Sequence, residues 1–164
     1  MVNKALVTVI ILGLAWSFAV SAAESGSSKG HYANHSTSLE TVELAGGGSI
    51  EVNHFKQFTF ADDPSHPIHN SSQDCVGVSR LDADGNIISA SGSCFGSKGE
   101  GDSVSWWWRQ EEAGTESCPI QCGTWGYFDG SGAHKGISGT GTWVNTVMFA
   151  DGNTGTWEGS YSIP

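Results

Sequence analysis

Basic side chains are scarce in this 164-residue chain. Lysine and arginine together number 7 against 17 aspartates and glutamates, which gives a formal net charge of −10 at pH 7. A chain this acidic is repelled by phosphate backbones, so we expect no direct contact with nucleic acid. Anionic membrane surfaces are disfavoured for the same reason.

Long apolar runs are absent beyond residue 22. The one such run, Ala5 to Val20, follows Lys4 and is followed by small residues. This three-part build predicts a secretory signal peptide over residues 1–22, and a retained membrane anchor is the alternative. The run is short for a membrane span, so cleavage is favoured. We therefore expect a secreted or periplasmic protein that has no membrane segment once the signal is removed.

Amphipathic helical patterns are also absent after the signal, and the remaining length fits one domain. Residues 23–36 are small and polar and have little to bury, so we expect a flexible N-terminal segment there. Its histidines, His31 and His35, could ligate a metal, but two histidines on a flexible segment do not define a site. The domain proper is expected over residues 37–164.

In place of helices, the sequence has alternation with a period of two. From Gly123 to Tyr161, glycine, threonine and tryptophan alternate, and Asp-Gly pairs interrupt the runs. This pattern is typical of antiparallel strands and tight turns. The chain thus predicts an all-β fold, either a sandwich or, as we favour, a single antiparallel β-barrel of about eight strands.

Turn and corner residues refine this prediction. A two-residue turn at Asp151-Gly152 would place Trp157 opposite Thr146, whereas a longer turn with a bulge would turn the opposing strand over. The many glycines between Asp129 and Gly141 suit the corners of a closed barrel. A phosphate-binding loop is the competing interpretation, and it is disfavoured because no helix follows.

Part of the chain resembles a known family. Bacterial secreted proteins with an allene oxide cyclase-like barrel, a calycin-like architecture shared with plant dirigent proteins, show features similar to the segment GSGAHKGISGTGTW and to the series Cys75, Asp84-Gly85, Cys94 and Gly101-Asp102. The resemblance implies an eight-stranded antiparallel barrel. Because such proteins often oligomerise, it also implies a homo-oligomer. The family includes cyclases, stereochemical guides and proteins with no assigned activity, and no catalytic position can be matched to this chain.

Four cysteines in an exported chain favour oxidation, although four allow three connectivities. Asp84-Gly85 as a two-residue turn places Cys75 directly opposite Cys94, at a separation that a disulfide accepts. We therefore predict one disulfide between Cys75 and Cys94 and a second between Cys118 and Cys122. A redox or metal role for the second pair is the alternative, but its spacing differs from that of the redox motif.

One strand pattern carries polar side chains on a face that otherwise reads as apolar. The face predicted to point inward is made of Ile50, Val52, His54, Lys56, Phe58 and Phe60. Inside a barrel, His54 and Lys56 would need partners or would orient a ligand. The alternative is that Lys56 reaches out of the barrel mouth and His54 bonds a backbone carbonyl.

Three consecutive tryptophans cannot all be buried in one strand. Trp106 and Trp108 share one face of Asp102 to Gln110, and Trp107 lies on the other face with Arg109. Trp106 and Trp108, joined by Trp125, either fill the barrel or line a pocket for a flat apolar ligand or a sugar ring. Trp107 would then form an exposed contact patch.

The segment from Asp62 to Asn70 contains two prolines and is predicted to be a loop. Asp62, Asp63, His66 and His69 could form a metal cluster, but nothing directs them to one centre, so we expect a solvated loop and no metal. No cofactor is expected either.

Three functions remain open from the sequence. The first is an exported barrel that binds a small, largely apolar or aromatic molecule through His54, Lys56, Trp106, Trp108 and Trp125. The second is a cyclase or isomerase acting on a hydrophobic substrate, with His54 as the candidate proton mover. The third is a structural or interaction module with a filled core. Serine or cysteine hydrolysis is disfavoured because no nucleophile elbow occurs and the cysteines are expected to be oxidised.

Overall fold

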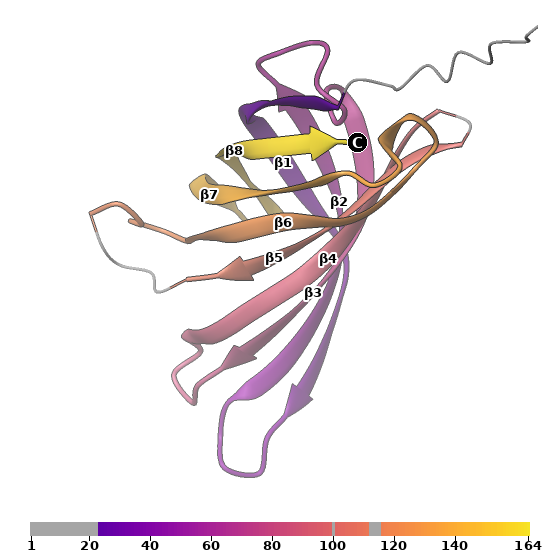
Figure 1. The fold of residues 1–164 in the computed structure, drawn as a ribbon. Coiled ribbons are helices and arrows are strands. Elements are labelled where there is room, and N and C mark those ends of the chain that lie inside the picture. The colour runs from indigo at the N-terminus through magenta and orange to yellow at the C-terminus, as the bar shows by residue number, and fades with distance from the viewer. Residues whose placement is uncertain (1–22, 100, 112–115) are drawn as a thin grey trace, which may run out of the picture.

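Antiparallel strands make up most of the part of the chain that the structure describes. The computed structural model describes residues 23–99, 101–111 and 116–164, so the signal peptide predicted over 1–22 lies outside the described residues. Eight strands pair in sequence order, and the first pairs with the last to close a barrel (Figure 1). They are β1 (Glu24–Glu43), β2 (Ser49–Ala61), β3 (Ser71–Leu81), β4 (Ile87–Gly99), β5 (Asp102–Gln110), β6 (Cys122–Ser131), β7 (Ser138–Phe149) and β8 (Gly152–Ile163). The all-β barrel prediction is confirmed.

Helix is limited to one short 3-10 turn, Gly132–His134, among the residues that the structure describes. Within the same residues, no helix has the length and apolar character needed to cross a membrane.

The segment expected to be flexible is instead a barrel strand. Residues 24–36 belong to β1; residues 24–29 pair with β8, and residues 30–35 pair with both neighbours, so that Gly30 lies opposite Ala61 of β2 and opposite Trp157 of β8. Its inward positions include Ser28, which is 1% exposed, and Tyr32. The small residues Ser28 and Gly30 are therefore buried, whereas Ser25 and Ser27 face solvent.

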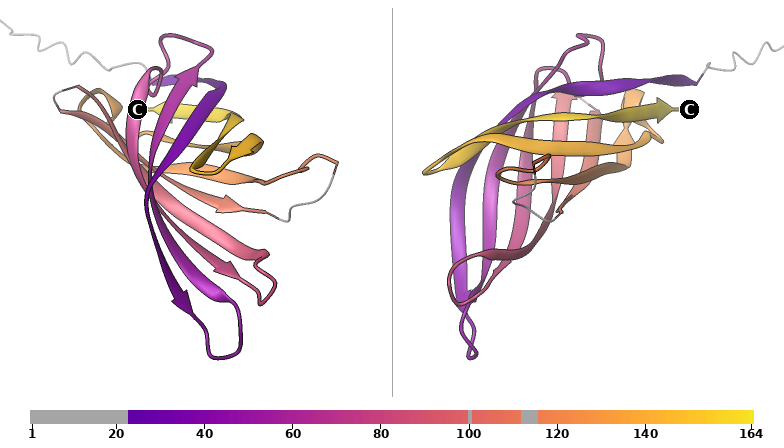
Figure 2. Two further views of the ribbon diagram at one scale, coloured as in Figure 1. Left: turned by 180° about the vertical axis from the view of Figure 1, so that it is seen from behind. Right: turned by 90° about the vertical axis from the view of Figure 1, so that its left-hand side faces the viewer.

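The barrel has two unlike ends. The β1–β2, β3–β4, β5–β6 and β7–β8 connections lie at one end, which we call the hairpin end. The β2–β3, β4–β5 and β6–β7 connections lie at the other, which we call the loop end. Figure 1 shows the hairpins spread apart along the left and the bottom of the view, and Figure 2 shows the same barrel from behind and from the side.

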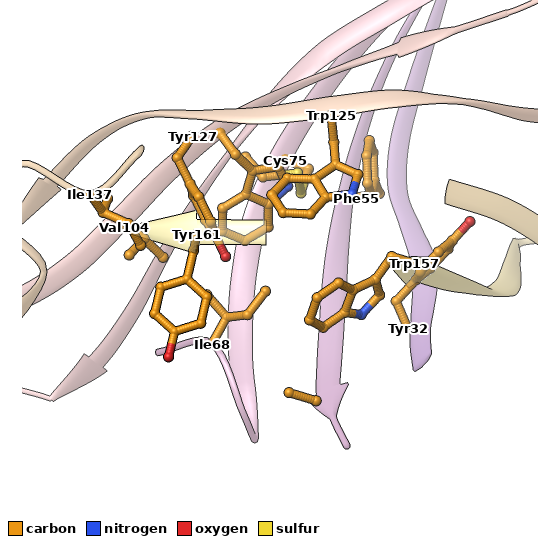
Figure 3. Packing of buried hydrophobic residues seen from close by; sticks show 13 residues of the cluster. Tyr32, Phe55, Ile68, Cys75, Val104, Trp125, Tyr127, Ile137, Trp157 and Tyr161 are labelled. Carbon is orange, nitrogen blue, oxygen red and sulfur yellow. A yellow bond between two sulfur atoms is a disulfide. The ribbon is translucent and has the colours of Figure 1, made fainter. Parts of the chain in front are cut away.

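The core is a cluster of aromatic rings between these two ends. Trp125 contacts Trp157 edge to face, with ring centroids 5.9 Å apart, and Trp125 contacts Tyr127 at 5.2 Å. Figure 3 shows Trp125, Tyr127 and Trp157 directed toward the same interior. Edge-to-face packing of this kind adds to the stabilisation from burial alone.

Glycine pairs make room for two of these rings. Gly77 and Gly92 lie opposite each other on β3 and β4, and the ring of Trp108 lies directly against both. A Cβ atom on Gly77 would come within 2.7 Å of Trp108 Cζ2, and one on Gly92 within 2.6 Å. The same arrangement recurs with Gly141, Gly159 and Trp125. Because these glycines lack side chains, the two rings can lie close against the wall, and a cavity remains beside them.

Both predicted disulfides are present. Cys75 lies opposite Cys94 and is bonded to it, and Cys118 is bonded to Cys122. The β3–β4 turn is nevertheless longer than two residues, since the Asp82 N–H donates to Asn86 O. A register shift at Leu81 compensates for the longer turn, which is why the simpler turn still gave the correct cysteine pairing.

Of the two registers left open for the last hairpin, the one that follows from a turn at Asp151-Gly152 is not found, and β7 is turned over as in the bulged alternative. Trp157 lies opposite Trp143 rather than Thr146, because the turn falls at Ala150-Asp151 and a bulge follows Asn145. The shift is by an odd number of residues, so β7 presents its other face to the interior. Trp143 and Asn145 consequently point into the barrel.

Candidate functional site

A cavity of about 300 Å³ occupies the barrel and opens at the hairpin end. Exposed side chains of Leu39, Ile87 and Met148 stand at its rim. Phe55, Ile68 and Tyr127 lie deeper, where the barrel is closed. An interior that aromatic side chains line without filling is the usual form of a small-molecule site.

The β2–β3 loop closes the other end. Ile68 is 6% exposed and lines the cavity, while His66 is 1% exposed and lies beside Trp157 and Tyr161, with ring centroids 5.3 Å and 4.7 Å away. Lys98 Nζ donates to the carbonyl of His66 at 3.2 Å. The expectation of a solvated loop is therefore wrong at His66 and Ile68, which form a plug.

Hydrogen bonds define the protonation state of His66. The Ile68 N–H donates to Nδ1 at 3.3 Å, so the ring proton resides on Nε2, which lies 2.7 Å from Ser28 Oγ and donates to it. Burial lowers the pKa of His66 to about 4, which keeps the ring neutral. Ser28 Oγ therefore accepts a hydrogen bond from His66, so His66 does not activate Ser28 as a nucleophile. In the described parts of the chain, no group of three or more histidine, cysteine or acidic side chains is arranged to hold a metal.

Four indoles form one side of the cavity, which we call the indole wall: Trp106, Trp108, Trp125 and Trp143. Backbone carbonyls hold two of them. Trp125 Nε1 donates to the carbonyls of Thr142 and Glu158 at 3.2 and 3.3 Å, and Trp143 Nε1 donates to that of Thr124 at 3.2 Å. The predicted inward direction of Trp106, Trp108 and Trp125 is correct. Trp107 lies on the outer face, with the Arg109 guanidinium 5.8 Å from its ring centroid.

Carboxamides form the facing side, which we call the amide wall: Asn34, Asn53, Gln57 and Asn153, from β1, β2 and β8. Asn34 Nδ2 donates to Asn153 Oδ1 at 3.0 Å, and Asn53 Nδ2 donates to Ser36 Oγ at 3.1 Å. The Oδ1 atoms of Asn34 and Asn53 are buried and have no hydrogen-bond partner within the described structure. These two oxygens are acceptors that the fold itself does not satisfy.

A hydrogen-bonded chain near the rim links the cavity to the second disulfide. Tyr32 donates to Asn145 Oδ1 at 2.5 Å, and Asn145 Nδ2 donates to Gln121 Oε1 at 2.7 Å. The Asn145 N–H also donates to the carbonyl of Gln121 at 2.8 Å. The Cys118–Cys122 disulfide closes the segment that carries Gln121, and the two hydrogen bonds from Asn145 hold this segment against β7.

The inward face predicted for β2 is wrong. Lys56 forms an ion pair with Asp74 on the outer surface, His54 is exposed, and neither lines the cavity. Phe58 and Phe60 also face outward, 45% and 49% exposed. The residues that line the cavity from β2 are those of the opposite face: Glu51, Asn53, Phe55, Gln57 and Thr59.

The amide wall escaped the sequence reasoning because an apolar face was assumed to be the inner one. The signal was present in Asn53 and Gln57, two carboxamides spaced so that both fall on the same strand face as Phe55. Pockets in proteins carry a few polar groups among apolar side chains, so a face that mixes amides with an aromatic ring was also a candidate for the inner one.

Charge is nearly absent from the cavity. Glu51, near the hairpin end, is the one charged side chain among the described residues that line it. Burial raises the pKa of the Tyr32 and Tyr127 hydroxyls well above their ordinary value, so both are neutral at physiological pH. The cavity thus combines aromatic surface, neutral hydrogen-bonding groups and one carboxylate.

Comparison with known proteins gives the fold a name. No family model and no curated protein matches the chain. Among solved structures, the pterocarpan synthase dirigent protein GePTS1 matches with a TM-score of 0.52 and 14% identity, over 86% of this chain and 87% of that one. The pterocarpan synthase dirigent protein PsPTS1 matches with a TM-score of 0.50 and 11% identity, over 85% and 95%. At this identity the likeness establishes the fold, a dirigent-like barrel, as the sequence resemblance had implied.

Proposed function

We propose that this dirigent-like barrel binds a small, largely apolar or aromatic molecule in the cavity at its hairpin end. The observation that supports the proposal most directly is the space of about 300 Å³ beside four indole rings. A small barrel whose role is only structural normally fills its interior with its own side chains. Here the glycine pairs let Trp108 and Trp125 lie close against the wall, which is consistent with the open interior.

The lining also indicates which molecules fit. The cavity volume of about 300 Å³ lies at the lower end of the range for small-molecule pockets. Lysine and arginine are absent from the described residues that line it, and its one charge is the carboxylate of Glu51. Anionic molecules would therefore be repelled, while neutral ring compounds would gain contact with the indole wall.

Tryptophan fluorescence tests the proposal, because six of the seven tryptophans follow residue 22 and four form the indole wall. Titration with a panel of lipids, phenols and sugars should quench or shift the emission for at least one class. In Ser79→Phe, a ring added to the cavity wall should abolish the response. The matched control is Val78→Phe, which adds the same ring to the outer face of β3 and should leave the response unchanged. Absence of any response across the panel would exclude binding.

Catalysis in the same cavity is a second candidate, of the cyclase or isomerase type. It is favoured by Glu51, which lines the cavity near the hairpin end and is a carboxylate able to move a proton there. His54, the catalyst suggested by the sequence, faces away from the cavity and is not part of this candidate. Glu51→Gln should retain ligand-induced quenching and lose turnover of a cyclisable substrate. Unchanged turnover in Glu51→Gln would remove the candidate.

Export of the barrel is the accompanying proposal. Two disulfides tie β3 to β4 and close the rim loop, and such bonds persist in oxidising compartments. Intact-mass analysis of the secreted or periplasmic fraction should give a chain that lacks residues 1–22 and four hydrogens. A full-length chain with free thiols in the cytosolic fraction would contradict export.

A further inference from the structure

One edge of β1 has no neighbouring strand near the hairpin end. β8 begins at Gly152, which pairs with His35, and the Ser36 N–H donates to the carbonyl of Asp151 in the turn before β8. From there β1 continues to Glu43, paired with β2 on one side only. Every residue from 37 to 43 is exposed. The wall between β1 and β8 is therefore closed up to Ser36 and open beyond it.

An edge of this kind presents main-chain hydrogen-bonding groups to solvent. Along a strand, alternate residues direct their N–H and C=O groups to one side, and the residues between them direct theirs to the other. On the side away from β2, the groups beyond Ser36 have no main-chain partner within the described structure. A bulge lies between Ser36 and Ser38, after which the five residues from Leu39 to Glu43 pair regularly with β2. These five residues form a regular edge strand.

We propose that this edge binds an extended, basic segment of another polypeptide, which adds a strand to the barrel beside β1. The added strand would take the line that β8 leaves free beyond the turn at Ala150-Asp151. The site is the edge of the sheet and not the cavity. The inference therefore goes beyond the proposed binding of a small molecule and does not depend on it.

The other stretch of β1 that lacks a neighbour is covered. Residues 24–29, at the loop end, pair with β8 but not with β2, and there the Asp62 N–H donates to the carbonyl of Lys29. No comparable segment covers residues 37–43 in the part of the chain that the structure describes. Proteins often protect a free edge with lysine or proline, and residues 37–43 contain neither. This edge is therefore available to a partner.

The side chains of the edge indicate which strand fits. Leu39 lines the rim of the cavity, and Glu43 shares its face, whereas Glu40 and Val42 lie on the opposite face. Leu39 and Val42 are 56% and 59% exposed. Glu40 and Glu43 form no ion pair within the described residues. Each face thus offers one apolar side chain and one carboxylate, so the complementary strand carries one basic and one apolar residue on each face.

The same carboxylates disfavour a second copy of this chain as the occupant. Two β1 edges paired with each other would bring two acidic segments together, and residues 36–43 contain no basic side chain to balance Glu40 and Glu43. Like charges that face each other across strands are destabilising. The excess of 17 acidic over 7 basic residues also attracts a basic partner at long range.

Two peptides test the proposal. Acetyl-Lys-Val-Thr-Lys-Leu-amide, docked antiparallel to Leu39–Glu43, places a lysine opposite each glutamate, and acetyl-Glu-Val-Thr-Glu-Leu-amide is its charge-reversed control. Each is titrated into the mature oxidised protein, up to about 1 mM because a short peptide loses conformational freedom when it docks. The lysine peptide should bind at least ~10-fold more tightly than the glutamate peptide, since two cross-strand charge pairs change sign.

Amide hydrogen exchange, followed by NMR, identifies the mode of binding. At saturation the lysine peptide should slow exchange at least ~10-fold at alternate amides between Leu39 and Glu43, because only every second N–H is directed to the edge. A peptide held by side chains alone would shift the spectrum without this alternating protection. That result would overturn the addition of a strand.

Charge-reversal variants locate the contact. In the double variant Glu40→Lys, Glu43→Lys, the preference should reverse, so that the glutamate peptide binds more tightly than the lysine peptide. The matched control is Asp129→Lys, Glu158→Lys, which changes the net charge equally at exposed positions of β6 and β8. The control should keep the original preference. An equal change of preference in both double variants would show that the edge of β1 is not the contact.

The remaining outcomes decide between occupants. A dimer found by sedimentation, with the Leu39–Glu43 amides protected in the absence of peptide, would assign the edge to a second copy and overturn the proposal. Failure of both peptides to bind would overturn it as well. Neither result bears on the cavity, because binding of a small molecule is measured separately by tryptophan emission.

Discussion

His66 should make the stability of this barrel sensitive to mild acid. The ring is 1% exposed, its Nδ1 accepts the Ile68 N–H and its Nε2–H donates to Ser28. Protonation would place a second N–H against the Ile68 N–H and would bury a positive charge. Among its charged neighbours, Lys98, His134 and His69 oppose the charge and only Asp63 favours it.

The magnitude follows from the two states of this one group. In the folded protein the pKa of His66 is about 4, because burial disfavours the cation, whereas in the unfolded chain it returns to 6.5. Between these two pH values unfolding takes up a proton, so acid favours the unfolded state. Each pKa unit is equivalent to about 1.4 kcal/mol, so the loss is about 3 kcal/mol. It begins as pH falls below 6.5 and is complete near pH 4.

Urea denaturation under non-reducing conditions measures this loss. The free energy of unfolding at pH 7.5 should exceed that at pH 4 by about 3 kcal/mol more in the unaltered protein than in His66→Gln. Glutamine can still donate to Ser28 but does not titrate, and the variant shares all other histidines. Identical pH dependence in the two proteins would refute the reasoning. So would a His66 imidazole that titrates near its ordinary pKa in NMR spectra of the folded protein.

Three further predictions follow from the fold. Replacing both Cys75 and Cys94 with alanine should lower the free energy of unfolding in urea by about 3 kcal/mol, because the disulfide closes a loop with a sequence separation of 19; an unchanged midpoint would contradict this. Gly77→Ala should push Trp108 into the cavity and weaken ligand-induced quenching, since the new Cβ would come within 2.7 Å of the ring; unaltered quenching would show that the ring is not held by the wall. Burial raises the pKa of Tyr32 and Tyr127 well above its ordinary value, so these two side chains should give no phenolate absorbance at pH 10 and should ionise only with alkaline unfolding, because the neutral hydroxyl is the form that folding favours; a normal titration curve for all three tyrosines of the folded protein would exclude the burial of these two.

The β-strands and the disulfides could be predicted from the sequence because both depend on local patterns of residues. Alternation alone gave the inward direction of Trp106 and Trp108, since the period of a strand admits only two choices of face. The pairing of Cys75 with Cys94 depended on one turn. Its extra residue was cancelled by a shift in the strand, so a simplified turn still led to the correct partner.

The cavity wall could not be predicted, because it reverses the usual burial rule. On β2, Phe58 and Phe60 face solvent while Asn53 and Gln57 face the interior, so hydrophobicity selected the wrong face. The register of the last hairpin could not be chosen from the sequence for a different reason. Ala150-Asp151 and Asp151-Gly152 are both acceptable turns, and only pairing across the whole barrel decides between them.

The plug formed by His66 and Ile68 makes this barrel a cup rather than a tunnel. A bound molecule of the kind proposed would have to enter and leave through the one open mouth. A molecule longer than the cavity would keep its far end in solvent, so length alone would not exclude it.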